Sequence, residues 1–515
     1  MREKYLRPID LLYHIRLAWN SLLSGLDPTQ AHVPYWSCGF KDGNLTGFHH
    51  SGAWDRCHDV ARELHGLTMA EQVIGERTPK SIVDDLSKHL LALFDEADGL
   101  PGTLADKTGL RFIHLHNIRE TTHGLTALIQ RGDGRAEYWA KRMVRRMRQA
   151  LDDKGQIHLD RLPKYVEEYN YQPSQEGRAV DALVRYYRVT TDPVALELAG
   201  LLASYALEHC FTAVGALTQA AGNHGHSINA LVAGMADLAL LRNDGSLLNR
   251  VKAAYDVGLP RFNSTFGWSM ESLNKFTARG ESNNTGDLLR ASLLLGRAGF
   301  PEYFEVAERI LRSHLLSSQI TDVRGLSDDP NQKEDRLRNL ASRIRGGFGF
   351  PTPNDLLARP DASPYVCDIT SGALDALCEV AKAIVTEDAA GLRINLLLDH
   401  ETKNLRVKSY LSGDGRIDIE SDRGRNLLVR IPPWVSPATL RLTLNGVEHP
   451  LAFIGRYLLV PAKEARQIVR ITFPMPETRT VESIAFERYT IDWRGNQIVA
   501  MSPPANYWPM FPPCS

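Results

Sequence analysis

The sequence predicts a mainly α region followed by a β region: an (α/α)6-type helical toroid over residues 1–388 and a C-terminal antiparallel β-sandwich over residues 389–515. From residue 8 to about 385, apolar residues recur at three-and-four spacing, which is typical of amphipathic helices. Near residue 390 the apolar period shortens to two, as in strands with one buried face. No strand–helix alternation and no Gly-x-Gly-x-x-Gly motif occurs, which disfavours a dinucleotide-binding fold.

The helical region holds about a dozen amphipathic segments separated by glycine, asparagine and aspartate. Leu183–Tyr187, Ala195–Ala199 and Leu231–Leu240 are examples. Many antiparallel helix pairs in one region of this size favour either a closed toroid or an open solenoid. The chain has no strict fixed-period repeat, which disfavours a solenoid built on a repeated consensus.

The β region shows short alternating runs, among them Leu392–Leu398, Leu405–Leu411 and Gln467–Phe473. The dipeptide Asn445-Gly446 is typical of a tight hairpin. Regular short strands with turn residues between them predict a sandwich.

Composition excludes several classes of partner. The 515 residues carry a formal net charge of -1, so no basic excess points to nucleic acid. No stretch approaches the roughly 18 uninterrupted apolar residues of a membrane span. The six cysteines are scattered without Cys-x-x-Cys, and the N-terminus has no signal-peptide pattern, so we expect a cytoplasmic protein with reduced thiols. A neutral partner such as a sugar is favoured, and a homo-oligomer stays open.

Five motifs, in chain order, carry a family resemblance. They are Gly225-His-Ser-Ile-Asn-Ala-Leu-Val-Ala-Gly-Met-Ala-Asp-Leu-Ala239, Leu428-Val-Arg-Ile-Pro-Pro-Trp434, Leu444-Asn-Gly446, Gly455-Arg-Tyr-Leu458 and Ile471-Thr-Phe-Pro-Met475. Together they resemble a helix and the sandwich module of the β-L-arabinofuranosidases, glycoside hydrolase family 127 and its relatives. The match runs from about residue 200 to residue 500. The resemblance implies a toroid-plus-sandwich fold and hydrolysis of a glycosidic bond in a carbohydrate substrate.

The resemblance also implies a catalytic zinc site that this chain does not reproduce. The family has Glu-x-Cys on one loop and Cys-Cys on a later loop, which together bind zinc and supply a cysteine nucleophile. The corresponding positions here are Glu281-Ser-Asn283 and Cys367-Asp368, so two thiolates are missing. Zinc held by thiolates takes four soft or borderline ligands. We therefore expect no cofactor, with zinc or another divalent metal as an option, and an altered chemistry or substrate.

Loop carboxylates are the candidate catalytic groups, because glycoside cleavage takes a proton donor and a second carboxylate or nucleophile. Glu271 lies in the stretch where the family places its acid/base, and we take it as the general acid; an ordinary solvated glutamate is the alternative. Asp368 or Glu281 is the candidate base or nucleophile, although acidic residues are also common at helix starts. Cys367 is the nucleophile by resemblance; a buried inert thiol is its alternative. Ser371 or Thr370 can cap the helix that follows.

A second group of residues is expected to bind the sugar. Histidines at loop–helix junctions can hydrogen-bond hydroxyls, aromatic rings can stack on sugar faces, and an arginine can bind an acidic sugar. These candidates are His116, His224, His226, Trp36, Trp54, Trp268, Phe348 and Arg345. Two other functions stay open: a polysaccharide lyase or sugar epimerase on the same toroid, and a non-catalytic sugar-binding relative.

Overall fold

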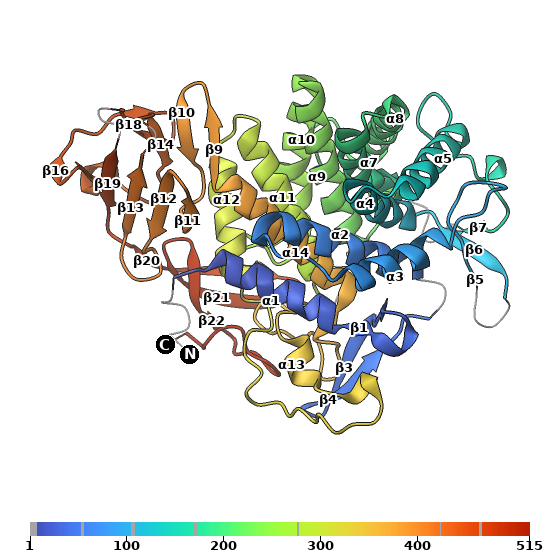
Figure 1. The fold of residues 1–515 in the computed structure, drawn as a ribbon. Helices are drawn as coiled ribbons and strands as arrows, with labels where there is room; N and C mark the ends of the chain where they lie inside the picture. The colour runs from blue at the N-terminus through green and yellow to red at the C-terminus, as the bar shows by residue number, and fades with distance from the viewer. Residues whose placement is uncertain are drawn as a thin grey trace.

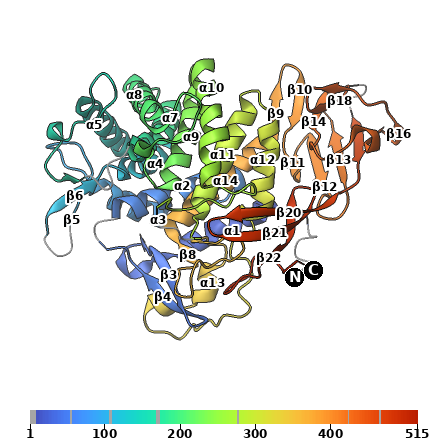
Figure 2. The ribbon, with the colours of Figure 1, turned by 180° about the vertical axis from the view of Figure 1, so that it is seen from behind.

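A closed ring of six inner helices forms the centre of the larger domain, and each inner helix packs against the next around the ring. The computed structural model describes residues 8–52, 56–104, 109–167, 173–274, 278–422, 424–462 and 466–514. Within them the inner helices are α2 (Arg56–Ile74), α4 (Asn117–Gln130), α7 (Ala179–Thr190), α9 (Gly225–Arg242), α11 (Ser282–Arg297) and α14 (Cys367–Ala383). Figures 1 and 2 show this ring from opposite sides. The predicted toroid is confirmed.

Outer helices cover the ring, each antiparallel to the inner helix that follows or precedes it. They are α1 (Leu11–Ser24), α3 (Lys80–Leu91), α5 (Gly134–Ala150), α8 (Pro193–Cys210), α10 (Gly245–Ala253) and α12 (Glu302–Ile310), with the short helices α6 (Pro173–Gly177) and α13 (Leu340–Ile344) between elements. The outer helix α5 buries one stripe, from Ala136 to Met147. By contrast, Gly225 to Ala239 of α9 are all buried, because an inner helix has protein on every side. No helix within the described residues is long and apolar enough to cross a membrane.

Short strands lie near one end of the ring, where β3, β4 and α13 appear at the bottom of Figure 1. One sheet has the order β4-β3-β8 and another β5-β6-β7, with a β1-β2 pair beside them. Their bounds are β1 (Leu26–Asp27), β2 (Val33–Pro34), β3 (Ser37–Lys41), β4 (Asn44–His49), β5 (Thr103–Leu104), β6 (Arg111–His114), β7 (Val166–Glu167) and β8 (Tyr365–Val366). Strand β8 runs directly into α14, so this end of the ring holds the inner-helix N-termini.

Two sheets form the predicted sandwich, with orders β17-β18-β14-β10-β9 and β11-β12-β13-β19-β15-β16. The first comprises β9 (Val385–Asp388), β10 (Gly391–Ile394), β14 (Leu427–Arg430), β17 (Phe453–Ile454) and β18 (Tyr457–Val460); the second comprises β11 (His400–Thr402), β12 (Leu405–Ser409), β13 (Arg416–Ser421), β15 (Arg441–Leu444), β16 (Val447–Glu448) and β19 (Gln467–Thr472). Pairing is antiparallel except between β10 and β14. Inward residues of both sheets share one apolar core. The division at residue 388 stays a prediction; β9 already pairs with β10.

The hairpin expected at Asn445-Gly446 joins β15 to β16, and both turn residues have positive φ, 50° and 83°. A third sheet, β20-β21-β22, follows the sandwich but packs on the toroid. Its strands are β20 (Glu477–Ile484), β21 (Glu487–Arg494) and β22 (Gln497–Ser502). Ile491 and Trp493 of β21 join a buried cluster with Trp268 from the loop before α11.

A buried ion cluster joins the toroid to the sandwich. Arg430 of β14 is 1% exposed and contacts Glu305 and Glu308 of α12. The indole Nε1 of Trp434 donates to Glu305 Oε1 at 3.0 Å. These charges compensate one another only when the two domains are docked.

Candidate active site

The first turns of the inner helices meet at one end of the ring. His58 of α2 reaches Asn117 of α4, with 3.1 Å between Nδ1 and Oδ1. Nε2 of the same imidazole lies 3.4 Å from Oδ2 of Asp368 in α14. His226 of α9 lies 3.7 Å from Glu281, which precedes α11, between Nδ1 and Oε2. Segments up to 310 residues apart therefore build one polar site at the positive ends of the helices.

The three predicted catalytic carboxylates share this site. Burial, then the neighbouring Glu271 and Asp368 carboxylates, raise the pKa of Glu281 well above its usual value. For Asp368, burial opposes ionisation, but the hydrogen bond and charge of His58 dominate and lower the pKa. Glu271 pairs with Arg279 at 2.9 Å, and its side chain is 19% exposed. The structure thus brings together carboxylates that the sequence places almost 100 residues apart.

The predicted sugar-binding histidines lie in the same site. Burial lowers the pKa of His116, His224 and His226 below the usual value of 6.5, and that of His226 falls to about 4. Nearby arginine, chiefly Arg178, adds to the effect for each of them. The imidazoles are therefore neutral at physiological pH, and each can donate one hydrogen bond and accept another.

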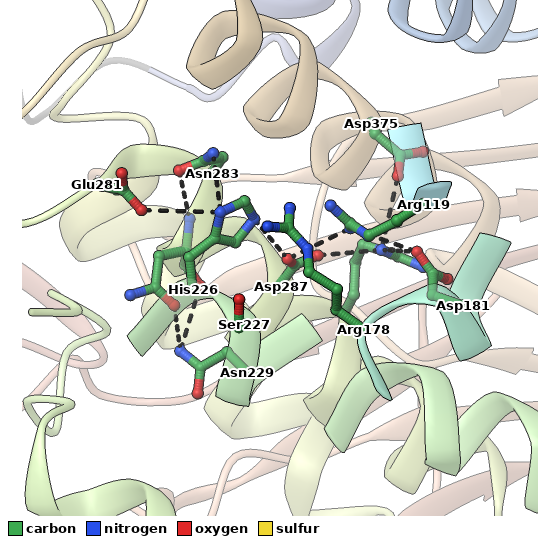
Figure 3. A network of polar contacts seen from close by, with 12 residues as sticks. Arg119, Arg178, Asp181, His226, Ser227, Asn229, Glu281, Asn283, Asp287 and Asp375 are labelled. Carbon is green, nitrogen blue, oxygen red and sulfur yellow. Dashed lines mark hydrogen bonds and ion pairs between the residues drawn. The ribbon is translucent and has the colours of Figure 1, made fainter. Parts of the chain in front are cut away.

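A buried network of arginines and carboxylates lies beside the site (Figure 3). Glu120 of α4 has no exposed surface and pairs with Arg178 at 2.6 Å, Arg119 at 3.1 Å and Arg62 at 3.5 Å. Glu120 and Arg62 were not among the predicted site residues, because charged residues within helices usually face solvent. The signal that was available is their position in the first two turns of inner helices.

Several predicted sugar contacts are wrong. Trp268 is 1% exposed, packs against β20–β22 and donates from Nε1 to Pro351 O at 3.2 Å, so its ring offers no open face. Phe348 is fully buried in the toroid core, so its ring has no open face either. Arg345 is exposed and donates to Tyr13 of α1, on the outer helix layer. Trp36 is half-buried, and Trp54 lies outside the described residues.

Cys367 is the first residue of α14 and is 1% exposed. Its side chain belongs to an apolar cluster with Tyr35, Cys38 and Tyr365, and its N–H donates to Trp36 O at 2.8 Å. The predicted capping role of Thr370 and Ser371 is wrong, because α14 begins before them. Thr370 instead bonds Phe348 of the preceding loop, and Ser371 Oγ donates to Arg62 O at 2.6 Å.

The residues at the family's zinc positions do not fit a thiolate zinc site. Asn283 is a neutral amide, and the Cys367 thiol lies in an apolar cluster rather than with Glu281. Among the described residues, the group with metal-ligand spacing is His224, His226 and Glu281, whose ligand atoms all lie within 4.8 Å of one another. Any metal here would have nitrogen and oxygen ligands.

No family model and no curated protein matches the sequence. Solved structures do match. A GH127 beta-arabinofuranosidase superposes with a TM-score of 0.62 at 15% identity, covering 96% of this chain and 82% of its own. A GH127 beta-L-arabinofuranosidase from Geobacillus stearothermophilus T6 gives 0.58 at 14% identity, with coverages of 95% and 80%. A structure described as a glycoside hydrolase gives 0.57 at 15%, with 92% and 84%. The chain therefore shares its fold, over nearly its whole length, with the GH127 beta-L-arabinofuranosidases.

Proposed function

We propose that the protein is a glycoside hydrolase that cleaves a glycosidic bond at the N-terminal mouth of the helical toroid. The observation that carries the proposal is the meeting of Glu271 and Glu281, from the segment before α11, with Asp368 of α14, beside neutral histidines. Glycoside cleavage generally uses a pair of carboxyl groups, and neutral imidazoles can exchange hydrogen bonds with sugar hydroxyls. The shared fold supports this assignment.

Asp368 acts at the anomeric carbon, as base or nucleophile. Its pKa is lowered, mainly through His58 once burial is overcome, so the carboxylate is ionised at neutral pH. The position at the start of α14 also favours a negative charge. A lone pair on Asp368 is thus available either to attack the sugar or to take a proton from water.

Glu271 gives a proton to the leaving glycosidic oxygen. Its backbone is fixed, since Glu271 O accepts from Gly225 N at 2.8 Å and Glu271 N donates to Arg279 O at 3.0 Å. Its carboxyl group is partly exposed at the mouth, where a leaving group can reach it. The bond that breaks joins the anomeric carbon to the leaving oxygen, and water supplies the oxygen and the protons of the products.

The substrate is a carbohydrate, and furanosides come first in testing because the two structures named above are arabinofuranosidases. His116 hydrogen-bonds its hydroxyls, and the half-buried Trp36 lies beside the start of α14. We propose that the cysteine-nucleophile chemistry is absent, because Cys367 is enclosed by apolar side chains.

The test is an activity screen on aryl furanosides, aryl pyranosides and acidic oligosaccharides, with products identified by mass and ultraviolet absorbance. Wild type is compared with Glu271→Gln, Asp368→Asn and Cys367→Ser; Glu448→Gln, an exposed change on β16, is the matched control. Cleavage with addition of water, lost by about 10³-fold or more in either carboxylate variant and kept in the other two proteins, is expected.

Three other outcomes would refute the proposal. A product that absorbs in the ultraviolet without addition of water would indicate a lyase. Loss of activity in Cys367→Ser, with its melting temperature unchanged, would indicate a thiol nucleophile. Sugar binding in calorimetry with no turnover of any substrate would indicate a binding protein.

A further inference from the structure

We infer that His224, His226 and Glu281 form a binding site for one divalent first-row metal ion, with two imidazole nitrogens and a carboxylate as ligands. This goes beyond the proposed hydrolysis, in which none of the steps uses a metal. The three ligand atoms lie within 4.8 Å of one another, the separation expected around one ion. His224 and His226 flank Gly225 at the start of α9, and Glu281 is the residue just before the next inner helix, α11.

The contacts of His226 indicate which ring nitrogen carries the proton and which can bind a metal. Its Nε2 lies 3.0 Å from Asp287 Oδ2, and Asp287 is held as an anion by Arg119 and Arg290. A carboxylate only accepts hydrogen bonds, so this close ion-pair contact favours the imidazole proton on Nε2. The lone pair is then on Nδ1, the atom that faces Glu281 (Figure 3). Histidines that bind metals usually donate their other N–H to a carboxylate in this way.

The same reasoning applies to His224. Its Nδ1 lies 2.8 Å from Ser227 Oγ, and Ser227 donates its own proton to Gln175 Oε1 at 3.0 Å. The serine oxygen must therefore accept from His224 Nδ1, which places the ring proton there. The lone pair of His224 is on Nε2 and is directed away from this chain of hydrogen bonds. A partner outside the group thus leaves each imidazole one nitrogen that can bind a metal.

Glu281 has a buried carboxyl oxygen without a hydrogen-bond partner among the described residues. The residue is 8% exposed, and the oxygen is Oε2. That oxygen lies 3.7 Å from His226 Nδ1, so the ionised carboxylate and the imidazole lone pair would be two acceptors that face each other in a buried place. Asn283 offers only a long contact to the same nitrogen, at 3.4 Å. A cation between the acceptors would satisfy both, and burying them without one is costly.

The donor atoms specify the class of ion. Two imidazoles and a carboxylate suit zinc, manganese, iron, cobalt or nickel, whereas calcium and magnesium prefer oxygen ligands alone. Three protein ligands leave a position open for water or a sugar hydroxyl. The set differs from a thiolate site because it contains no sulfur ligand.

The test measures metal binding without substrate, so it is independent of the hydrolysis proposal. Metal-depleted protein is titrated with Zn²⁺ by calorimetry, and its Co²⁺ form is examined by visible absorption. We expect one equivalent per chain in the wild type. Glu281→Gln and His226→Ala should lose it, and Asp287→Asn should bind about 10–100-fold more weakly. His32→Gln removes a histidine that pairs with a carboxylate elsewhere and should bind normally.

Two results would overturn the inference. One is a wild-type protein that takes up no Zn²⁺, or variants that bind it as the wild type does. The other is an intense thiolate-to-Co²⁺ band in the near ultraviolet that disappears in Cys367→Ser. Circular dichroism of each metal-depleted variant guards against misfolding, and retained binding in Glu281→Asp, which keeps the carboxylate, would separate ligation from a structural effect.

Discussion

Glu63 in α2 is predicted to make the protein less stable as pH rises. The side chain is 1% exposed, and neither carboxyl oxygen has a hydrogen-bond partner among the described residues. Burial, with a smaller contribution from Asp59 one turn earlier, raises the pKa of Glu63 from 4.5 to about 8. At neutral pH the folded protein therefore holds a protonated carboxyl group, which the unfolded chain ionises.

The magnitude follows from proton linkage. An acid whose pKa is higher in the folded state gives full stability below the unfolded value of 4.5, and that stability is lost as pH rises toward 8. The loss is about 1.4 kcal/mol per pH unit, or about 5 kcal/mol in all. With an unfolding entropy of about 1 kcal/mol per kelvin for a chain of this length, the melting temperature should fall by about 4–5 °C.

The assay is the melting temperature of wild type and Glu63→Gln between pH 5 and pH 9. The glutamine is neutral in both states, so the variant should match the wild type near pH 5 and melt about 4–5 °C higher at pH 9. Glu208→Gln, an exposed change on α8, is the control and should track the wild type throughout. Parallel curves for wild type and Glu63→Gln would refute the claim that the buried carboxyl is protonated.

Two further substitutions test the packing, and a third tests whether the Cys367 thiol takes part in activity. Arg430→Met should cost about 3–5 kcal/mol, because two glutamates of α12 lose their buried partner. Arg470→Met, at an exposed position of β19, should change the melting temperature little. Gly124→Ala should cost about 1–3 kcal/mol, since its Cβ would lie 2.7 Å from a backbone carbon of α2, while Gly134→Ala meets nothing within 4 Å and should be tolerated. Denaturant unfolding measures all four. Cys367→Ala should keep activity if the thiol only packs, and a dead, folded variant would contradict this.

Local sequence patterns were sufficient for the architecture. The three-and-four spacing from Leu231 to Leu240 predicts a helix that the structure extends to Gly225–Arg242. Alternation from residue 392 onward predicts strands because one face of each is buried in the sandwich core. Trp268 shows the limit of this reasoning. An aromatic residue in a polar loop suits both a sugar platform and a packing contact, and only β21, more than 200 residues later, decides between them.

The site was predictable in part. Resemblance drew attention to Glu271, Glu281, Cys367 and Asp368, and the structure brings the three carboxylates together. It does not bring Cys367 with them, because the residue before Asp368 points toward β3 and its neighbours instead. The hydrogen-bond partners that orient His226 are also invisible in a single sequence, since they depend on how neighbouring helices are placed around the ring.

The way the ring is assembled bears on how this site can evolve. Each inner helix contributes its own first turn to the mouth, and each is carried by a separate helical hairpin whose packing depends on residues further along. A substitution at one helix start therefore alters the chemistry of the mouth while the hairpins of the other helices keep their own packing. Asn283 and Asp368 stand at two such helix starts, where a side chain can change while the ring of helices is kept.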